Sequence, residues 1–340
     1  MKKIPKSVCV ILLALSLAAC GGANVPKEKY SVTWMDLFDT VITLSGYAKS
    51  RGAFDEVAER AYGELLTLHR LYDIYNTYDG IENLCTVNDN AGGSAVQADE
   101  RILSLLRLSK EMHSATGGRV NVMMGSVLSL WHEARTYSLE NPEGAHIPDA
   151  QALSEAAKHT DIDLLEINEA HSTVRIADKE ARLDVGAIAK GYASQRVCDM
   201  LPSGYLLSAG GNVVVTGEKP DGSAWVVGIQ KPFTNDVLCR LSVKRGSVVT
   251  SGNYQRYYTV NGKMYHHIID PDTHMPSAYW EGVTMVCEDS GVADALSTAL
   301  FLTDREGGTS LLKKYGAEAL WIDADGNIQY TDGLASMILP

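Results

Sequence analysis

Two stretches in the first half of the chain repeat apolar residues at helical spacing. The first stretch has apolar residues at Phe54, Val57, Ala58, Ala61, Leu65, Leu68 and Tyr72. The second begins after Asp99, a suitable N-cap, and runs through Ile102, Leu105, Leu106 and Met112 to Gly117-Gly118. Because residues three and four apart share one face of a helix, the pattern predicts two long amphipathic helices that end at these boundaries.

From about residue 173 the pattern changes to short runs rich in β-branched residues. The runs read STVRIA, YLLSA, NVVVTG, AWVVGIQ, VLCRLSV, SVVTSG and GVTMVC, with turn sequences such as PDGS, NG and DADGN between them. One helical stretch, about Val292 to Leu302, interrupts the strands. We therefore predict an α+β fold with helices mainly in the N-terminal half and a largely antiparallel β-sheet in the C-terminal half.

The N-terminus has the three parts of an export signal. Lys2, Lys3 and Lys6 precede an uncharged, mostly apolar run from residue 8 to residue 19, which ends in Leu-Ala-Ala before Cys20. This run is too short for a membrane-spanning helix, which needs about 20 residues, and it suits a signal peptide. The sequence before Cys20 resembles a bacterial lipobox; the alternative is an ordinary signal peptide with a chance cysteine.

These features predict three regions. Residues 1–19 are a lipoprotein signal peptide, residues 20–30 a tether that begins at the lipidated Cys20, and residues 31–340 one catalytic region. We expect the protein to be lipid-anchored to the cell membrane, on its extracytoplasmic face.

Charge and cysteine content exclude several classes of function. The formal net charge of −12 becomes −15 when the three lysines of the signal peptide are removed. Nucleic acid is not an expected partner, because its binding depends mainly on clustered basic residues. Cys85, Cys198, Cys239 and Cys287 form no Cys-x-x-Cys pair, which argues against a zinc or iron–sulfur site and leaves their disulfide state open.

The segment LDVGAIAKGYA, residues 183–193, combines one carboxylate, one lysine and two glycines. It matches neither the P-loop nor the dinucleotide-binding glycine motif. It predicts a strand ending at Val185, followed by a helix from Ile188 to Met200. Backbone amides at such a helix start can face an anion, and Lys190 could add positive charge; the alternative is a lysine that is simply solvated.

A second candidate site lies in the helical sequence GVADALSTAL. Asp294 and Thr298 are four residues apart, so their oxygens share one helix face and could converge on a hard cation. In the alternative interpretation, Asp294 only stabilises the positive end of its helix and the Thr298 hydroxyl bonds to a backbone carbonyl.

A third candidate is the sequence MYHHIIDPDTHMP. Strand alternation directs His266 and His267 to opposite faces, so one of them at most enters a given site. Asp270, Asp272 and Thr273 follow in an Asp-Pro turn and favour a polar pocket there.

Together these motifs resemble the ApbE-type flavin transferases, also called FAD:protein FMN transferases. The resemblance rests on LDVGAIAKGYA, LLSAGGNVVVTG, VVTSGNYQRYY, YHHIIDPDTHMP and VADALSTAL in the family's order, preceded by FDT, DIYN and GGRVNVMMGSVLSLWH. It extends from about residue 31 to the C-terminus. It implies an enzyme that binds FAD with Mg2+, splits the pyrophosphate, attaches FMN to a threonine or serine of an acceptor protein and releases AMP. The expected acceptor is a flavoprotein, a membrane redox subunit.

The resemblance also implies roles for individual residues. The metal ligands would be the side chains of Asp294 and Thr298 and the backbone carbonyl of Ala187. His267 would be the base for the acceptor hydroxyl. The residues along FAD would be Phe38, Tyr75, Asn121, Asp184, Lys190 and Ile269.

Some positions depart from the family pattern. Position 38 is often methionine and position 121 aspartate, whereas this chain has Phe38 and Asn121. The usual Asp-Pro-Arg-Thr-Gly turn here contains Asp272 and His274. Two other functions remain open: a metal-dependent FAD pyrophosphatase, in which water replaces the acceptor hydroxyl, and a lipoprotein that only binds flavin.

Overall fold

The computed structural model describes residues 27–340. The predicted signal peptide and the lipidation site Cys20 lie outside the described residues. Strand β1 begins at Glu28, so residues 28–30 belong to the folded region and the predicted tether boundary at residue 30 is wrong. The reason is pairing: Glu28, Lys29 and Tyr30 lie in register opposite residues 46–48 of the next strand. Within residues 27–340, no helix is long and apolar enough to cross a bilayer.

The secondary structure alternates between helices and strands along the chain. The helices are α1 (Arg51–Tyr72), α2 (Leu84–Asp89), α3 (Glu100–Ala115), α4 (Gly125–Glu140), α5 (Ala150–Ala156), α6 (Ala189–Asp199), α7 (Ser290–Phe301), α8 (Arg305–Tyr315) and α9 (Asp332–Ala335). The first strands are β1 (Glu28–Leu37), β2 (Thr40–Ala48), β3 (Val96–Gln97), β4 (Leu165–Asn168), β5 (Thr173–Ile176), β6 (Tyr205–Ala209), β7 (Asn212–Val215) and β8 (Trp225–Gln230). The remaining strands are β9 (Val237–Val243), β10 (Gly246–Gly252), β11 (Tyr257–Val260), β12 (Lys263–His266), β13 (Gly282–Cys287), β14 (Glu318–Ile322), β15 (Ile328–Tyr330) and β16 (Ile338–Leu339).

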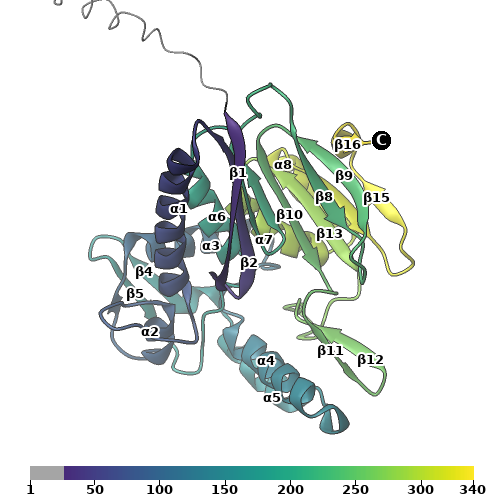
Figure 1. The fold of residues 1–340 in the computed structure, drawn as a ribbon. Helices are drawn as coiled ribbons and strands as arrows, with labels where there is room; N and C mark the ends of the chain where they lie inside the picture. The colour runs from purple at the N-terminus through teal and green to yellow at the C-terminus, as the bar shows by residue number, and fades with distance from the viewer. Residues whose placement is uncertain (1–26) are drawn as a thin grey trace, which may run out of the picture.

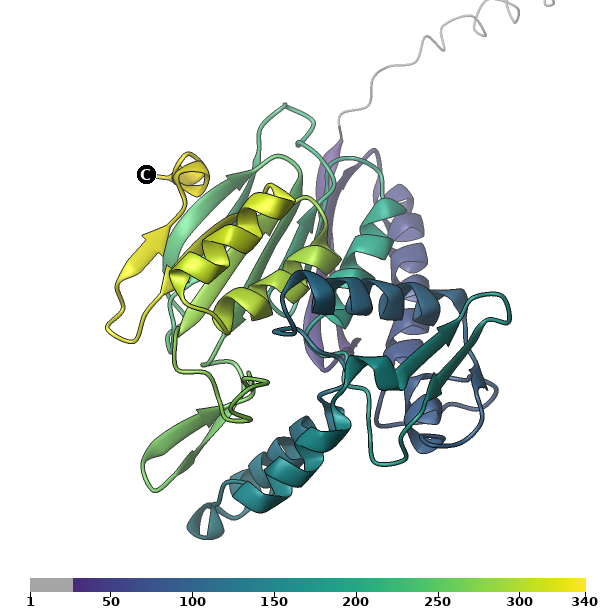
Figure 2. The same ribbon diagram turned by 180° about the vertical axis from the view of Figure 1, so that it is seen from behind.

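An eight-stranded antiparallel sheet forms the centre of the molecule, in the order β1-β2-β6-β7-β10-β13-β14-β15. Helices α1, α6, α7 and α8 cover one face, and Figure 2 shows them from behind. The small sheet β16-β9-β8 covers the other face (Figure 1). Strand alternation explains the two layers: Val249 packs in the helix-side core, whereas its neighbour Val248 packs under the small sheet.

The α+β prediction is confirmed. The two amphipathic helices are α1 and α3, and the latter begins after the N-cap Asp99. The seven predicted strand runs correspond to β5, β6, β7, β8, β9, β10 and β13. Strands β1 and β2 were not predicted. Strand β1, at the edge of the sheet, alternates exposed and half-buried positions, and this pattern is weaker than the apolar runs of the central strands. Strand β2 is mostly buried, but only Ile42 and Leu44 among its buried residues are large and apolar.

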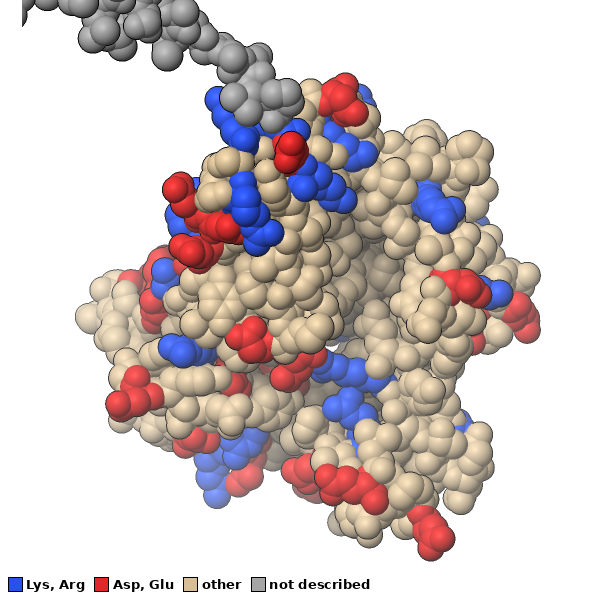
Figure 3. All heavy atoms as spheres, in the orientation of Figure 1, with Lys and Arg blue, Asp and Glu red and all other residues tan. Residues whose placement is uncertain are grey.

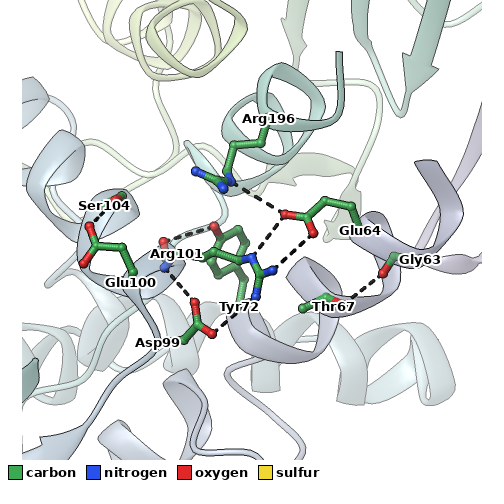
Figure 4. A network of polar contacts seen from close by, with 9 residues as sticks. All are labelled: Gly63, Glu64, Thr67, Tyr72, Asp99, Glu100, Arg101, Ser104 and Arg196. Atoms are coloured by element: carbon green, nitrogen blue, oxygen red, sulfur yellow. Dashed lines mark hydrogen bonds and ion pairs between the residues drawn. The ribbon is translucent and has the colours of Figure 1, made fainter. Parts of the chain in front are cut away.

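A polar network connects α1 and α3 with the last turn of α6. Glu64 of α1 accepts hydrogen bonds from the Arg101 guanidinium of α3, at 3.2 Å from Nε and 3.4 Å from the terminal nitrogen. The Arg196 Nε of α6 lies 3.8 Å from the same carboxylate. Tyr72 donates a hydrogen bond to the Arg101 carbonyl (Figure 4). One carboxylate therefore joins α1, α3 and α6.

An arm projects from this body at the end where β2 and β10 meet the cavity described below (Figure 1). It contains α4, α5 and the hairpin β11–β12. The Trp131 and Tyr265 rings stack with their centroids 6.0 Å apart, and Trp131 donates its indole N–H to the His274 carbonyl. Ile269 and Tyr258 complete a small apolar cluster there. The arm is thus packed on its own core and stands beside the main sheet.

Helices α6 and α7 pack unusually close together at Gly191. A β-carbon at this position would overlap the Ser290 carbonyl oxygen and the Asp294 side chain. We predict that Gly191→Ala destabilises the protein by about 1–3 kcal/mol, since an added methyl group forces well-packed helices apart. Chemical denaturation monitored by circular dichroism measures this effect.

Gly63 in α1 is the matched control, because nothing lies within 4 Å of a β-carbon built there. Gly63→Ala should leave the stability unchanged or raise it by about 0.5–1 kcal/mol, since alanine has the better helix propensity. Equal stabilities for the two variants would contradict the packing argument.

Candidate functional site

A cavity of about 870 Å3 lies between the main body and the arm. Figure 3 shows the hollow from one side, with Lys and Arg atoms beside its opening. Its lining comes from the β1–β2 turn, the segment after α1, the start of α6, the loop after β12, and α7. All of the site residues predicted within residues 27–340 line it: Phe38, Tyr75, Asn121, Asp184, Ala187, Lys190, His267, Ile269, Asp294 and Thr298. The fold therefore brings these residues together, while their individual roles remain predictions.

The start of α6 meets the buried carboxylate of Asp294. Only 4% of Asp294 is exposed, and its Oδ2 accepts a 2.8 Å hydrogen bond from the Gly191 N–H. This amide belongs to the first turn of α6, where N–H groups have no acceptor within the helix. Lys190 Nζ lies 3.8 Å from the same oxygen. The carboxylate thus joins the two helices through one hydrogen bond and one ion pair.

Asp294 and its surroundings fit a hard cation. Among residues 27–340, no hydrogen bond reaches the carbonyl oxygen of Ala187, which lies in the turn before α6. The Thr298 hydroxyl is 3.5 Å from the Asp294 carbonyl, a long and weak hydrogen bond. The described residues contain no cluster of three or more His, Cys, Asp or Glu side chains suited to a metal. A metal ion here would depend on a mixed set of oxygen atoms, which is the chemistry that Mg2+ prefers.

Two of the aspartates that line the cavity, Asp294 and Asp184, are unfavourable as isolated charges. Burial raises the pKa of Asp294, although Lys190 and the Gly191 N–H lower it in part. Burial also raises the pKa of Asp184, against the opposing effects of the Gly186 N–H and nearby cations. A bound cation would offset this cost at Asp294.

His266 is buried and His267 is exposed, the difference that strand alternation predicts, although both residues line the cavity. The buried His266 donates from Nε2 to the Ser277 carbonyl at 2.8 Å, and its Nδ1 accepts from the Ile268 N–H. Both of its ring nitrogens are therefore used within the protein. His267 is exposed on the cavity wall. Of the two histidines, only His267 can therefore offer a ring nitrogen to a ligand.

The free nitrogen of His267 is identified by its backbone contact. Its Nδ1 lies 3.2 Å from the Arg256 carbonyl oxygen, which can only accept, so Nδ1 carries the hydrogen. Nε2 then has a free lone pair. Although solvent reaches the ring, crowding by protein atoms and the cations Arg256 and Lys190 lower the pKa of His267. The imidazole is therefore neutral at physiological pH, and its Nε2 can accept a hydrogen bond.

Phe38 reaches the cavity from a strained turn. Phe38 and Asp39 connect β1 to β2 with φ angles of 55° and 50°. Two-residue hairpin turns of this kind favour Asn-Gly, because bulky residues rarely adopt positive φ. The Phe38 N–H donates to His69 Nδ1 at 3.2 Å, and the two rings pack edge to face. These contacts hold an aromatic side chain at the cavity wall.

The departure at Asn121 has a local explanation. Its side-chain amide donates to the Thr160 carbonyl at 2.7 Å, and its oxygen accepts from the Met123 N–H. An aspartate could not donate to Thr160. The amide is therefore used to shape the turn before α4 at the edge of the cavity.

The altered turn after β12 is also held by protein contacts. Arg119 lies 2.7 Å from Asp272 and 3.6 Å from Asp270, so the acidic residue at position 272 has a basic partner from another segment. His274 has a φ angle of 57°, a conformation that favours the glycine usual in this turn.

Several cavity residues were not identified from the sequence. Arg135 and Arg256 both line the cavity, and burial together with the nearby Arg256 lowers the pKa of Arg135. His132 stacks on Tyr75 with ring centroids 5.4 Å apart. His132 and Arg135 are three residues apart on α4, a helical spacing that could have indicated a shared polar face.

The segment before α6 is not the strand that the sequence predicts. Residues 181–185 contain only an isolated bridge between Arg182 and Met124. The buried Asn88 side chain instead accepts from the Leu183 N–H and donates to the Leu183 carbonyl. An amide side chain thus replaces a neighbouring strand. The helix that follows, predicted for residues 188–200, is α6 at Ala189–Asp199.

The four cysteines within residues 27–340 do not line the cavity. Cys85, Cys198, Cys239 and Cys287 are all free thiols.

Comparison with known proteins identifies the family of this chain. The family model described as "ApbE family" matches residues 38–321, which is most of the chain. The chain belongs to the ApbE family. The FAD:protein FMN transferase of Treponema pallidum (strain Nichols) is 29% identical, with coverage of 98% of this chain and 97% of the relative. The FAD:protein FMN transferase of Klebsiella pneumoniae (strain 342) is 28% identical over 79% of this chain and 81% of its own.

Solved ApbE structures share the fold. The ApbE protein of Thermotoga maritima matches with a TM-score of 0.81 and 27% identity, covering 92% of this chain and all of that one (100%). The apo form of the Pseudomonas stutzeri flavinyl transferase ApbE matches with a TM-score of 0.74, at 22% identity over 92% of this chain and 99% of that one. The second likeness concerns the fold alone.

From the raised pKa of Asp294 we predict how the stability of this ApbE-family protein changes with pH. Because the folded state binds the proton more tightly than the unfolded state, the ionised carboxylate costs stability at neutral pH. In metal-free buffer, Asp294→Asn should therefore be more stable than the wild type at pH 7–8. The difference should shrink as the pH falls through the folded-state pKa, and vanish below the unfolded value of about 4. Thermal unfolding of both proteins across this range measures it.

Asp289 provides the matched control, because it is the N-cap of the same helix and its side chain accepts from the Val292 N–H. Asp289→Asn preserves this acceptor and should show no such stabilisation. A wild type that stays the more stable protein at pH 8 without metal would contradict a net cost at Asp294.

Proposed function

We propose that this protein transfers FMN from FAD to a threonine or serine hydroxyl of an acceptor protein, with Mg2+ as cofactor and AMP as the second product. Its family and the named relatives support a flavin transferase. The single observation that carries the finer proposal is the position of the exposed His267 in the same cavity as the buried Asp294 and Lys190.

The residues around Asp294 would hold the metal. The Asp294 carboxylate, the Thr298 hydroxyl and the Ala187 carbonyl all line the cavity. Bound there, Mg2+ would offset the charge of the FAD pyrophosphate and polarise its phosphorus–oxygen bonds. Lys190 would add a second positive charge beside the same ligand. This local charge offsets the acidic character of the chain as a whole.

His267 would start the transfer. Its Nε2 accepts the proton of the acceptor hydroxyl, and the hydroxyl oxygen attacks the phosphorus of the FMN half of FAD. A new phosphoester bond forms, the pyrophosphate bond breaks, and AMP leaves with the bridging oxygen. The contact between Nδ1–H and the Arg256 carbonyl keeps Nε2 directed to the cavity during this step.

The cavity is large enough for a dinucleotide. Its volume of about 870 Å3 is in the upper part of the usual range for ligand pockets, roughly 300–1,000 Å3. Aromatic side chains stand on its walls, including Phe38 and Tyr75, and Ile269 adds an apolar surface. These residues would contact the flavin and adenine rings, while Asp184 and Lys190 would contact the polar parts of FAD.

We also propose that the enzyme acts at the cell surface, anchored through a lipid on Cys20 to the extracytoplasmic face of the membrane. The basic leader, the short apolar run and the small residues before Cys20 support this proposal. The acceptor would then be a flavoprotein exposed in the same compartment, such as a membrane redox subunit.

The exchange of His267 tests the transfer mechanism. His267→Ala should retain FAD and lose transfer by about 10²–10⁴-fold, because a positioned base typically contributes that much. FAD affinity is measured by titration of flavin fluorescence. Transfer is measured by mass spectrometry of FMN covalently attached to acceptor proteins, using membrane proteins of the source bacterium grown without the enzyme.

His266→Gln is the matched control for this experiment, because it retains a polar side chain at the buried neighbour. It should reduce transfer far less than His267→Ala. Addition of EDTA to the wild type should abolish transfer, and Mg2+ should restore it. Release of AMP without covalent FMN on any protein would instead support the pyrophosphatase, and loss of FAD binding by His267→Ala would contradict the role as a base.

The exchange Cys20→Ser tests the anchor. Without the lipid, the short apolar run cannot hold the protein in a bilayer, so the variant should move from the membrane fraction to the soluble fraction. Immunoblots of fractionated cells measure the distribution, with Cys85→Ser as a control that keeps the lipobox cysteine. Retention of Cys20→Ser on membranes through high-salt and carbonate washes would contradict the lipid anchor.

A further inference from the structure

An exposed aromatic cluster stands at the rim of the cavity. We call it the rim cluster and define it as Phe233, Tyr254 and Tyr257. The Phe233 ring packs edge to face on the other two rings, with centroid distances of 5.9 Å to Tyr254 and 6.1 Å to Tyr257. Phe233 is 49% exposed and Tyr257 41% exposed. None of the three residues lines the cavity itself, so the cavity contents do not explain them.

The chain holds Phe233 in this exposed position at an energetic cost. Phe233 lies in the loop between β8 and β9 with a φ angle of 59°, a conformation that is unfavourable for an aromatic residue. The loop is closed by a hydrogen bond from the Lys231 N–H to the Asp236 carbonyl and by one from the Gln230 side chain to the Thr234 carbonyl. A residue in such a conformation costs about 1–3 kcal/mol, and such residues are frequent at functional sites.

The rim cluster is directly connected to the proposed base. Tyr257 is paired in register with His266, the neighbour of His267. The residue before Tyr257 is Arg256, whose carbonyl accepts from both the backbone N–H and the Nδ1–H of His267. Gln230, Gln255 and Arg256 line the cavity next to the cluster. The cluster and His267 thus share one stretch of rim.

The position of the rim cluster beside His267 favours the acceptor protein as the molecule that binds there. FAD would fill the inner cavity, from the oxygen atoms around Asp294 outward. The acceptor hydroxyl has to approach His267 Nε2, and the chain on either side of that hydroxyl has to remain outside the cavity. The rim formed by residues 254–257 and the β8–β9 loop offers a surface for it, because Arg256 in this rim contacts His267 directly. Exposed aromatic side chains beside a site are typical of protein recognition.

We propose that the rim cluster docks an extended segment of the acceptor protein, with an apolar side chain close to the threonine or serine that receives FMN. This proposal rests on the proposed function. The segment packs its apolar side chain against Phe233 and Tyr257, and this contact directs its hydroxyl to His267. The cluster contributes to recognition of the protein substrate and leaves the binding of FAD unaffected.

The test exchanges Phe233 and measures the two substrates separately. Phe233→Asn removes the aromatic ring but keeps a residue that tolerates positive φ, so the loop retains its conformation. Its KM for the acceptor should rise by at least about tenfold, since a central aromatic contact typically contributes that much or more. The kcat at saturating acceptor and the Kd for FAD should stay unchanged. The probe is the protein that acquires covalent FMN from the wild type, purified in its unmodified form.

Two further variants make the outcome specific. Phe233→Tyr retains the aromatic ring and should have the same KM for the acceptor as the wild type. Tyr330→Ser removes an exposed aromatic residue, 43% exposed, from β15 at the end of the sheet order, and should have no effect. An unchanged acceptor KM in Phe233→Asn, or a weaker Kd for FAD in that variant, would overturn the proposal. If the wild type modifies no protein at all, the proposed function itself fails, and this result is distinguishable from the other two.

Discussion

The close packing of α6 against α7 is the constraint on which the site depends. Gly191 allows the two helices to approach, and its N–H then reaches the carboxylate of Asp294. Burial of this carboxylate would be costly by itself, and the first turn of α6 and Lys190 offset part of that cost. The part of the negative charge of Asp294 that these groups do not offset favours binding of a cation. A structural contact between two helices thus becomes the starting point for binding a charged ligand.

The rest of the cavity is built from segments that are far apart in the chain. The β1–β2 turn contributes Phe38, α4 contributes Arg135, and the loop after β12 contributes His267. The central sheet and the arm meet at the cavity, so small changes in the angle of the arm would alter its width. Arg119, in the segment before α4, pairs with Asp270 and Asp272 in the turn after β12, so these ion pairs join the two segments that carry the arm.

Positive φ angles at non-glycine residues occur around this region. Phe38, Asp39, Phe233 and His274 all have this conformation, and all lie in turns that border the cavity or its rim. Each such residue costs free energy that the surrounding contacts have to supply. The core provides it: the two layers on either side of the large sheet bury apolar residues along nearly every central strand. The stability gained by burying apolar residues on the sheet thus offsets the cost of the strained residues around the site.

The sequence by itself determined most of the elements and the identity of the candidate residues. Periodicity located α1 and α3, apolar runs located the central strands, and strand alternation separated His266 from His267, because these properties depend on neighbours in the chain. Only the tertiary structure decided the rest. Three features depend on contacts between distant segments: the edge strand β1 with its neighbour β2, the replacement of a strand by the Asn88 side chain, and the positions of Arg135 and Arg256. Local patterns carry no information about such contacts, since the partners are set by how the sheet and helices pack.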